Sequence, residues 1–96
     1  MSNFTIRVEL HGSPKENDYE KLHLAMEAKN LSRSLVDSGT KYLLPHAEYI
    51  TDKFPTYTAT QIVNLTITIT KTIWADFEVF VTATQGRWEY YNLRKP

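Results

Sequence analysis

The chain contains no cysteine in its 96 residues. This absence excludes disulfides, zinc sites built on thiolates and thiol nucleophiles. The sequence also lacks an excess of either charge, because eleven basic residues balance eleven acidic ones. Composition therefore does not indicate a DNA partner or a strongly basic nucleic-acid-binding surface. Only the C-terminus is locally basic, with Arg87, Arg94 and Lys95.

No apolar run approaches the roughly 20 residues needed to cross a bilayer. Strand-like sequence follows Met1 directly, without the apolar segment of a signal peptide. We therefore expect one cytoplasmic domain over residues 1–96, without a membrane partner. The sequence also lacks a phosphate-binding loop, a dinucleotide fingerprint, zinc-ligand spacing and a Ser-His-Asp pattern. We therefore expect neither a cofactor nor a metal centre.

Residues 4–10 alternate in polarity, which predicts a half-buried strand. Phe4, Ile6, Val8 and Leu10 share one side, and Arg7, Glu9 and His11 share the other. A helix follows, with Tyr19, Leu22, His23 and Met26 on one face. Capping boxes at Ser13/Glu16 and at Asn17/Glu20 compete for its start, and we choose Asn17 because the apolar spacing begins at Tyr19. Asn30 predicts a left-handed stop.

The middle of the chain contains a predicted hairpin, with strands 31–36 and 40–44 around a turn at 37–39. Pro45 ends the second strand, and residues 46–57 are predicted to form a loop. Residues 74–84 form the predicted last strand. The aromatic tail 87–91 either adds an edge strand or packs over the sheet.

Residues 58–72 give conflicting indications. Strict alternation at 65–70 favours a strand. Thr58 and Gln61, however, form a capping box, and Ile62, Leu65, Ile69 and Ile73 fit one helical stripe. We predict a helix, because a second helix completes the fold and tertiary context overrides weak propensity.

The resulting order, β-α-β-β-α-β, predicts an α+β ferredoxin-like sandwich, in which two helices cover one face of a four-stranded antiparallel sheet. The first and third strands would be neighbours. We expect a core that contains Phe4, Ile6, Val8, Leu22, Met26 and Val79. Arg7, Glu9 and Phe80 would lie on the opposite, uncovered face.

The first half of the chain also contains a set of short motifs that together resemble those of a known protein family. They are Arg7-Val8-Glu9-Leu10-His11, Asp18-Tyr19, Leu22-His23, Ala25-Met26-Glu27, Ser32-Arg33, Tyr42, Leu44-Pro45 and Ala47-Glu48-Tyr49. Residues 4–49 thereby resemble the bacterial GhoS-type family of endoribonuclease antitoxins from type V toxin–antitoxin systems. The resemblance implies a ferredoxin-like fold, similar to that of the small CRISPR-associated ribonucleases, and cleavage of a toxin's messenger RNA.

RNA cleavage needs a base, an acid and a cation for the phosphate. His11 is the candidate acid or base, and Glu9 would orient it or hold a metal, as an acidic residue near the end of the first strand does in the ribonucleases that the family resembles. Arg7 and Arg33 are candidate phosphate ligands. Phe80 is a candidate surface for base stacking, as are Tyr42, Trp88, Tyr90 and Tyr91. Each candidate also has a purely structural alternative. His11 could be a solvent-facing turn residue, Glu9 a surface charge or the ion-pair partner of Arg7, and the aromatic residues could serve packing.

Two further histidines are weaker candidates. His23 lies on the apolar helix face, which favours a core role. His46 and Glu48 would point the same way in an extended segment and form an acid–base pair. We expect His46 near Phe4 and far from His11, because the third strand should run antiparallel to the first.

Two functions therefore remain open. The resemblance favours an endoribonuclease antitoxin that acts on single-stranded RNA. Neutral net charge and the lack of a tight histidine–carboxylate cluster favour a non-catalytic module that binds protein or RNA on the open sheet face, with a homodimer as one form.

Overall fold

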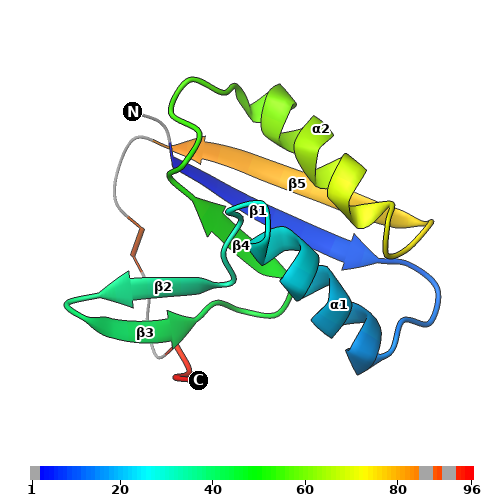
Figure 1. The fold of residues 1–96 in the computed structure, drawn as a ribbon, viewed down its shortest axis with the longest axis horizontal. Helices are drawn as coiled ribbons and strands as arrows, with labels where there is room; N and C mark the ends of the chain where they lie inside the picture. The colour runs from blue at the N-terminus through cyan, green and yellow to red at the C-terminus, as the bar shows by residue number, and fades with distance from the viewer. Residues whose placement is uncertain (1–2, 85–87, 90–92) are drawn as a thin grey trace.

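The computed structural model describes residues 3–84, 88–89 and 93–96. It is an α+β fold of two helices and antiparallel strands in the order β-α-β-β-β-α-β (Figure 1). Neither helix, each of 12 residues, is long and apolar enough to cross a membrane. The elements are β1 Asn3–Leu10, α1 Glu16–Glu27, β2 Ser34–Asp37, β3 Thr40–Leu43, β4 Glu48–Thr51, α2 Ala59–Thr70 and β5 Phe77–Thr84.

The main sheet has three strands in the order β4-β1-β5, and both neighbours of β1 run antiparallel to it. Figure 1 shows α1 and α2 on the same face of this sheet. The alternation predicted for β1 is confirmed, because its apolar side chains are buried on the helix side and Arg7 and Glu9 are exposed. Neither α1 nor α2 covers the opposite face of the sheet (Figure 1).

The core lies between the sheet and the two helices. Five of the six predicted core residues are fully buried, namely Phe4, Ile6, Val8, Leu22 and Met26. Val79 is half-buried and packs against them. Tyr49 and Ile62 complete the centre, since both have no exposed surface.

The helical prediction for residues 58–72 is confirmed by α2. Thr58 is the N-cap, its hydroxyl accepts from the Gln61 amide at 3.2 Å, and its own amide donates to Gln61 Oε1 at 2.8 Å. The buried hydroxyls of Thr66 and Thr70 donate to carbonyls one turn earlier, at 2.8 Å each. These bonds explain how alternating threonines fit a helix, because no buried hydroxyl is left without a partner.

The predicted start of the first helix is wrong by two residues, because Asn17 was the expected N-cap. The helix begins at Glu16, and Lys15 is the N-cap. The Lys15 amide donates to Asp18 Oδ2 at 2.8 Å, so an acidic side chain at the third helical position decides the start. The predicted stop is confirmed, since Asn30 has a φ of 66°.

The predicted four-stranded ferredoxin sheet is also wrong. Residues 46–57 were expected to be a loop, yet they contain β4, which pairs with β1 from Phe4↔Thr51 to Arg7↔Glu48. The hairpin β2–β3 forms a separate two-stranded ribbon (Figure 1). Pro45 cannot donate to a ladder and Ala47 has a φ of 60°, so the chain leaves β3 and starts a new strand at Glu48.

Candidate functional site

The uncovered face of the sheet carries the residues predicted for the site. Strand register places Arg7 on β1 between Glu48 on β4 and Phe80 on β5. The next outward-facing pair is Glu9 opposite Glu78. Opposite residues of an antiparallel pair point to the same side, so these side chains share one surface. We call Arg7, Glu9, His11, Glu78 and Phe80 the strip. A depression of about 290 Å³ is lined by four of its members, Arg7, Glu9, Glu78 and Phe80.

Two members of the strip lack the contacts expected of structural residues. Phe80 is 70% exposed, so it contributes little to the core. Arg7 is exposed, and in the described part of the chain no carboxylate lies within 4.0 Å of it. The alternative of an ion pair between Arg7 and Glu9 is therefore not formed. Both groups are available to a ligand.

His11 lies at the end of β1 and is held by two carboxylates. Its Nδ1 is 3.2 Å from Asp76 Oδ1, and its Nε2 is 3.1 Å from Glu78 Oε1. Hydrogen bonds to Glu78 and then Asp76 raise the pKa of this imidazole above its usual 6.5. The charged imidazolium is thereby favoured. His11 is better suited to give a proton than to take one.

The backbone also fixes His11. Its amide donates to the Asp76 carbonyl at 2.9 Å, and its carbonyl accepts from Trp74 Nε1 at 2.8 Å. These bonds hold the end of β1 against the segment that enters β5. The sequence contained the residues of this cluster, but their contact depends on the β1–β5 register, which spacing along the chain does not reveal.

Arg33 lies apart from the strip. Its Nη1 is 3.8 Å from Glu20 Oε1 of α1, and its amide donates to Glu27 Oε1. The guanidinium is thus directed toward the helix that covers the other face of the sheet. The structure does not bring the two predicted phosphate ligands, Arg7 and Arg33, together.

The predicted pairing of His46 with Glu48 is wrong. Glu48 is opposite Arg7 on the open face, whereas the His46 ring lies 4.3 Å from the Tyr19 ring of α1. The left-handed Ala47 between them breaks the strand geometry that would have aligned the two side chains. The predicted position of His46 near Phe4 is also wrong, because β4 places Thr51 there.

His23 has the core position that its helix face indicated. The side chain is 4% exposed, and its Nδ1 is 2.7 Å from the Tyr49 hydroxyl. Its Nε2 has no hydrogen-bond partner among the described residues. Burial lowers the pKa of this imidazole, which favours the neutral form. His23 therefore stabilises the packing of α1 on β4 rather than a reaction on the open face.

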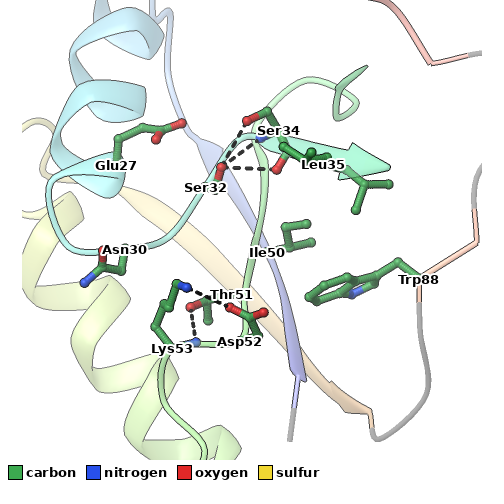
Figure 2. Close-up of a pocket in the computed structure, with 11 residues that line it drawn as sticks. Glu27, Asn30, Ser32, Ser34, Leu35, Ile50, Thr51, Asp52, Lys53 and Trp88 are labelled. Atoms are coloured by element: carbon green, nitrogen blue, oxygen red, sulfur yellow. Dashed lines mark hydrogen bonds and ion pairs between the residues drawn. The ribbon is translucent and has the colours of Figure 1, made fainter. Parts of the chain in front are cut away.

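The described part of the aromatic tail packs beside the strip. Trp88 Nε1 donates to Thr5 Oγ1 at 2.9 Å, which places the indole over the open face of β1. Figure 2 shows Trp88 beside Leu35 and Ile50 in a hollow of about 390 Å³. Further along, the Leu43 amide donates to the Arg94 carbonyl at 2.6 Å, so the tail also pairs with β3. The predicted stacking residues Tyr90 and Tyr91 and the basic Arg87 lie outside the described residues.

In the ranges 3–84, 88–89 and 93–96, no three histidine or acidic side chains are arranged to hold a metal ion. No protein-family model matches the chain, and neither a curated protein nor a solved structure is similar enough to be a match. The strip is therefore assigned from its own geometry and chemistry.

Proposed function

We propose that this protein binds single-stranded RNA on the open face of its sheet and cleaves it there. One observation carries the proposal. The exposed Arg7 guanidinium, which has no carboxylate partner in the described residues, lies opposite Phe80, which is also exposed. His11 follows directly after the end of β1, and its two carboxylate partners raise its pKa. A cation, an aromatic surface and an acid are the groups that unpaired RNA and its phosphates require. The likeness of residues 4–49 to endoribonuclease antitoxins supports the same function.

The reaction would use the 2′-hydroxyl of the RNA as the nucleophile. Glu9 removes its proton, and the oxygen attacks the adjacent phosphorus while the bond to the 5′-oxygen breaks. His11 donates a proton to that leaving oxygen, and Arg7 neutralises the charge on the non-bridging oxygens. The products are a 2′,3′-cyclic phosphate and a 5′-hydroxyl, and no metal is needed for this proton balance.

Protein binding without catalysis is the second candidate, and charge favours it. The carboxylates of Glu9, Glu48 and Glu78 share this face with the Arg7 guanidinium. An acidic surface repels the RNA backbone and attracts a basic peptide or protein instead. If Arg7 provides the phosphate contact, RNA binding should show a shallow salt dependence, with a slope near −0.7 for one phosphate.

Incubation with a mixed-sequence single-stranded RNA, with and without EDTA, distinguishes the two functions. We expect cleavage that resists EDTA, is abolished by His11→Ala and is strongly reduced by Arg7→Ala. Lys41→Ala is the matched control, because it removes an exposed cation from the β3 ribbon. Equal cleavage by His11→Ala and the wild type would contradict the site. No cleavage and no RNA binding by the wild type would leave protein binding as the function.

A further inference from the structure

β5 is an edge strand of the main sheet. β5 is eight residues long and pairs with β1 along its whole length, from Asn3↔Thr84 to Leu10↔Phe77. In the described residues no other strand pairs with it, because it ends the order β4-β1-β5. Alternate residues of such an edge direct their N–H and C=O groups away from the sheet. These groups are a template for another strand.

β5 lacks the features by which proteins block an exposed edge. It contains no proline and no lysine, and its ladder with β1 continues without a bulge. Glu78 is its single charged residue, and the rest are residues of high strand propensity apart from Ala83. Edges that must stay single usually carry a charge pointing inward, a proline or a twist. This composition favours pairing.

A hollow of mixed polarity along β5 is the second observation. It has a volume of about 380 Å³, and every residue that lines it belongs to α2, to β5 or to the turn between them. Its apolar lining comes from Val63, Ile67, Ala75, Phe77 and Val79, and the charged Lys71 and Asp76 line the rest. Because no residue of α1, β1 or β4 lines it, the hollow lies on the outer side of the sheet. An added strand would place alternate side chains there.

We propose that two copies of this chain associate through antiparallel pairing of their β5 strands, about a twofold axis midway between the two copies of Phe80. Opposite residues in an antiparallel pair must face the same side of the sheet. The axis must therefore lie at a pair of identical residues and not between two neighbouring pairs. This register places Phe80 against Phe80 of the second copy on the open face. Val79 lies opposite Val81 on the helix side, beside the hollow.

The same register does not place like charges opposite each other. Glu78 of one copy lies opposite Thr82 of the other, so the two Glu78 carboxylates are separated. The combined sheet has the strand order β4-β1-β5-β5-β1-β4. Its central rung contains two Phe80 rings flanked by two Arg7 side chains, about 14 Å apart at the backbone from the spacing of neighbouring strands. If the proposed RNA function holds, this rung gives RNA a second cation, but the pairing itself does not depend on RNA.

The charge of residue 82 tests the register. Sedimentation equilibrium should detect a concentration-dependent dimer of the wild type. Thr82→Glu places a new carboxylate opposite Glu78 of the other copy, on both sides of the axis. This change should weaken the dimer roughly tenfold. Thr82→Lys forms an opposite-charge pair with Glu78 and should keep it or tighten it. A protein that stays monomeric into the millimolar range, or a dimer that both variants leave unchanged, would overturn the proposal.

The absence of native cysteine permits a second, independent measurement. Under mild oxidation, Phe80→Cys should form a disulfide-linked dimer, because the twofold axis brings its two copies within the Cα separation of a disulfide. Thr82→Cys is the matched control on the same strand and face. Its copies would be about 13 Å apart along the strands and should stay unlinked. Linking at 82 but not at 80 would show a different register. RNA binding that survives in a monomer would leave the proposed function intact.

Discussion

Two histidines of this protein are pushed toward opposite protonation states by their surroundings. Hydrogen bonds that Glu78 and Asp76 accept from the His11 ring raise the pKa of His11, while burial lowers that of His23. Burial penalises the charged form, and neighbouring carboxylates favour it. The surroundings of His11 thus favour the protonated imidazole, and those of His23 favour the neutral one.

The His11 pKa can be measured directly. NMR titration of the ring protons should show His11 holding its proton above pH 6.5, because both ring nitrogens contact carboxylates. Glu78→Gln and Asp76→Asn should each lower this pKa, since the hydrogen bond to Glu78 is the largest single cause of the shift and the hydrogen bond to Asp76 the next. A His11 midpoint at or below 6.5 would contradict its role as the acid.

His23 should make the fold sensitive to acid. Its folded pKa lies below 6.5, so between these two values the unfolded chain binds the proton more readily. Stability from His23 is therefore complete above about pH 6.5 and is lost as the pH falls below it. Urea titrations from pH 8 to pH 5 should show this decline, and His23→Asn should flatten it. His11 acts in the opposite direction, since its contribution is lost as the pH rises.

At the scale of elements, the N-cap decides the structure of α2. Residues 65–70 alternate like a strand, and the helix forms because Thr58 and Gln61 satisfy each other's amides and the buried threonine hydroxyls bond within the helix. The β1 strand and the stop at Asn30 were predictable in the same way, from local chemistry. β4 was not, because its four residues become a strand only by pairing with β1.

Removing the cap of α2 should destabilise the protein measurably. Thr58→Ala should lower the free energy of unfolding by about 1 kcal/mol, since the Gln61 amide loses its acceptor. Thr60→Ala, an exposed change inside the same helix, should have a neutral or slightly stabilising effect. Thermal or urea unfolding of both variants provides the measurement. Equal stabilities would mean that tertiary packing alone holds this helix.

For the whole molecule, one core joins both helices to the sheet. Leu22 of α1 has no exposed surface and packs in the cluster that includes β1 and Ile62 of α2. Leu22→Ala should therefore cost about 2–5 kcal/mol in a single unfolding transition. Leu24→Ala is the matched control, because Leu24 is 72% exposed on the same helix. A loss below about 1 kcal/mol at Leu22 would mean that α1 packs through a different face.

The sequence by itself determined the alternation of β1, the helix at Thr58, most of the core and the exposure of Arg7, Glu9 and Phe80, because each depends on residues close in the chain. Tertiary structure decided the rest. Glu48 entered a strand through its pairing with β1, and His11 met Asp76 and Glu78 only through the β1–β5 register. Contacts between segments some 65 residues apart follow from strand pairing and packing, which local spacing does not encode.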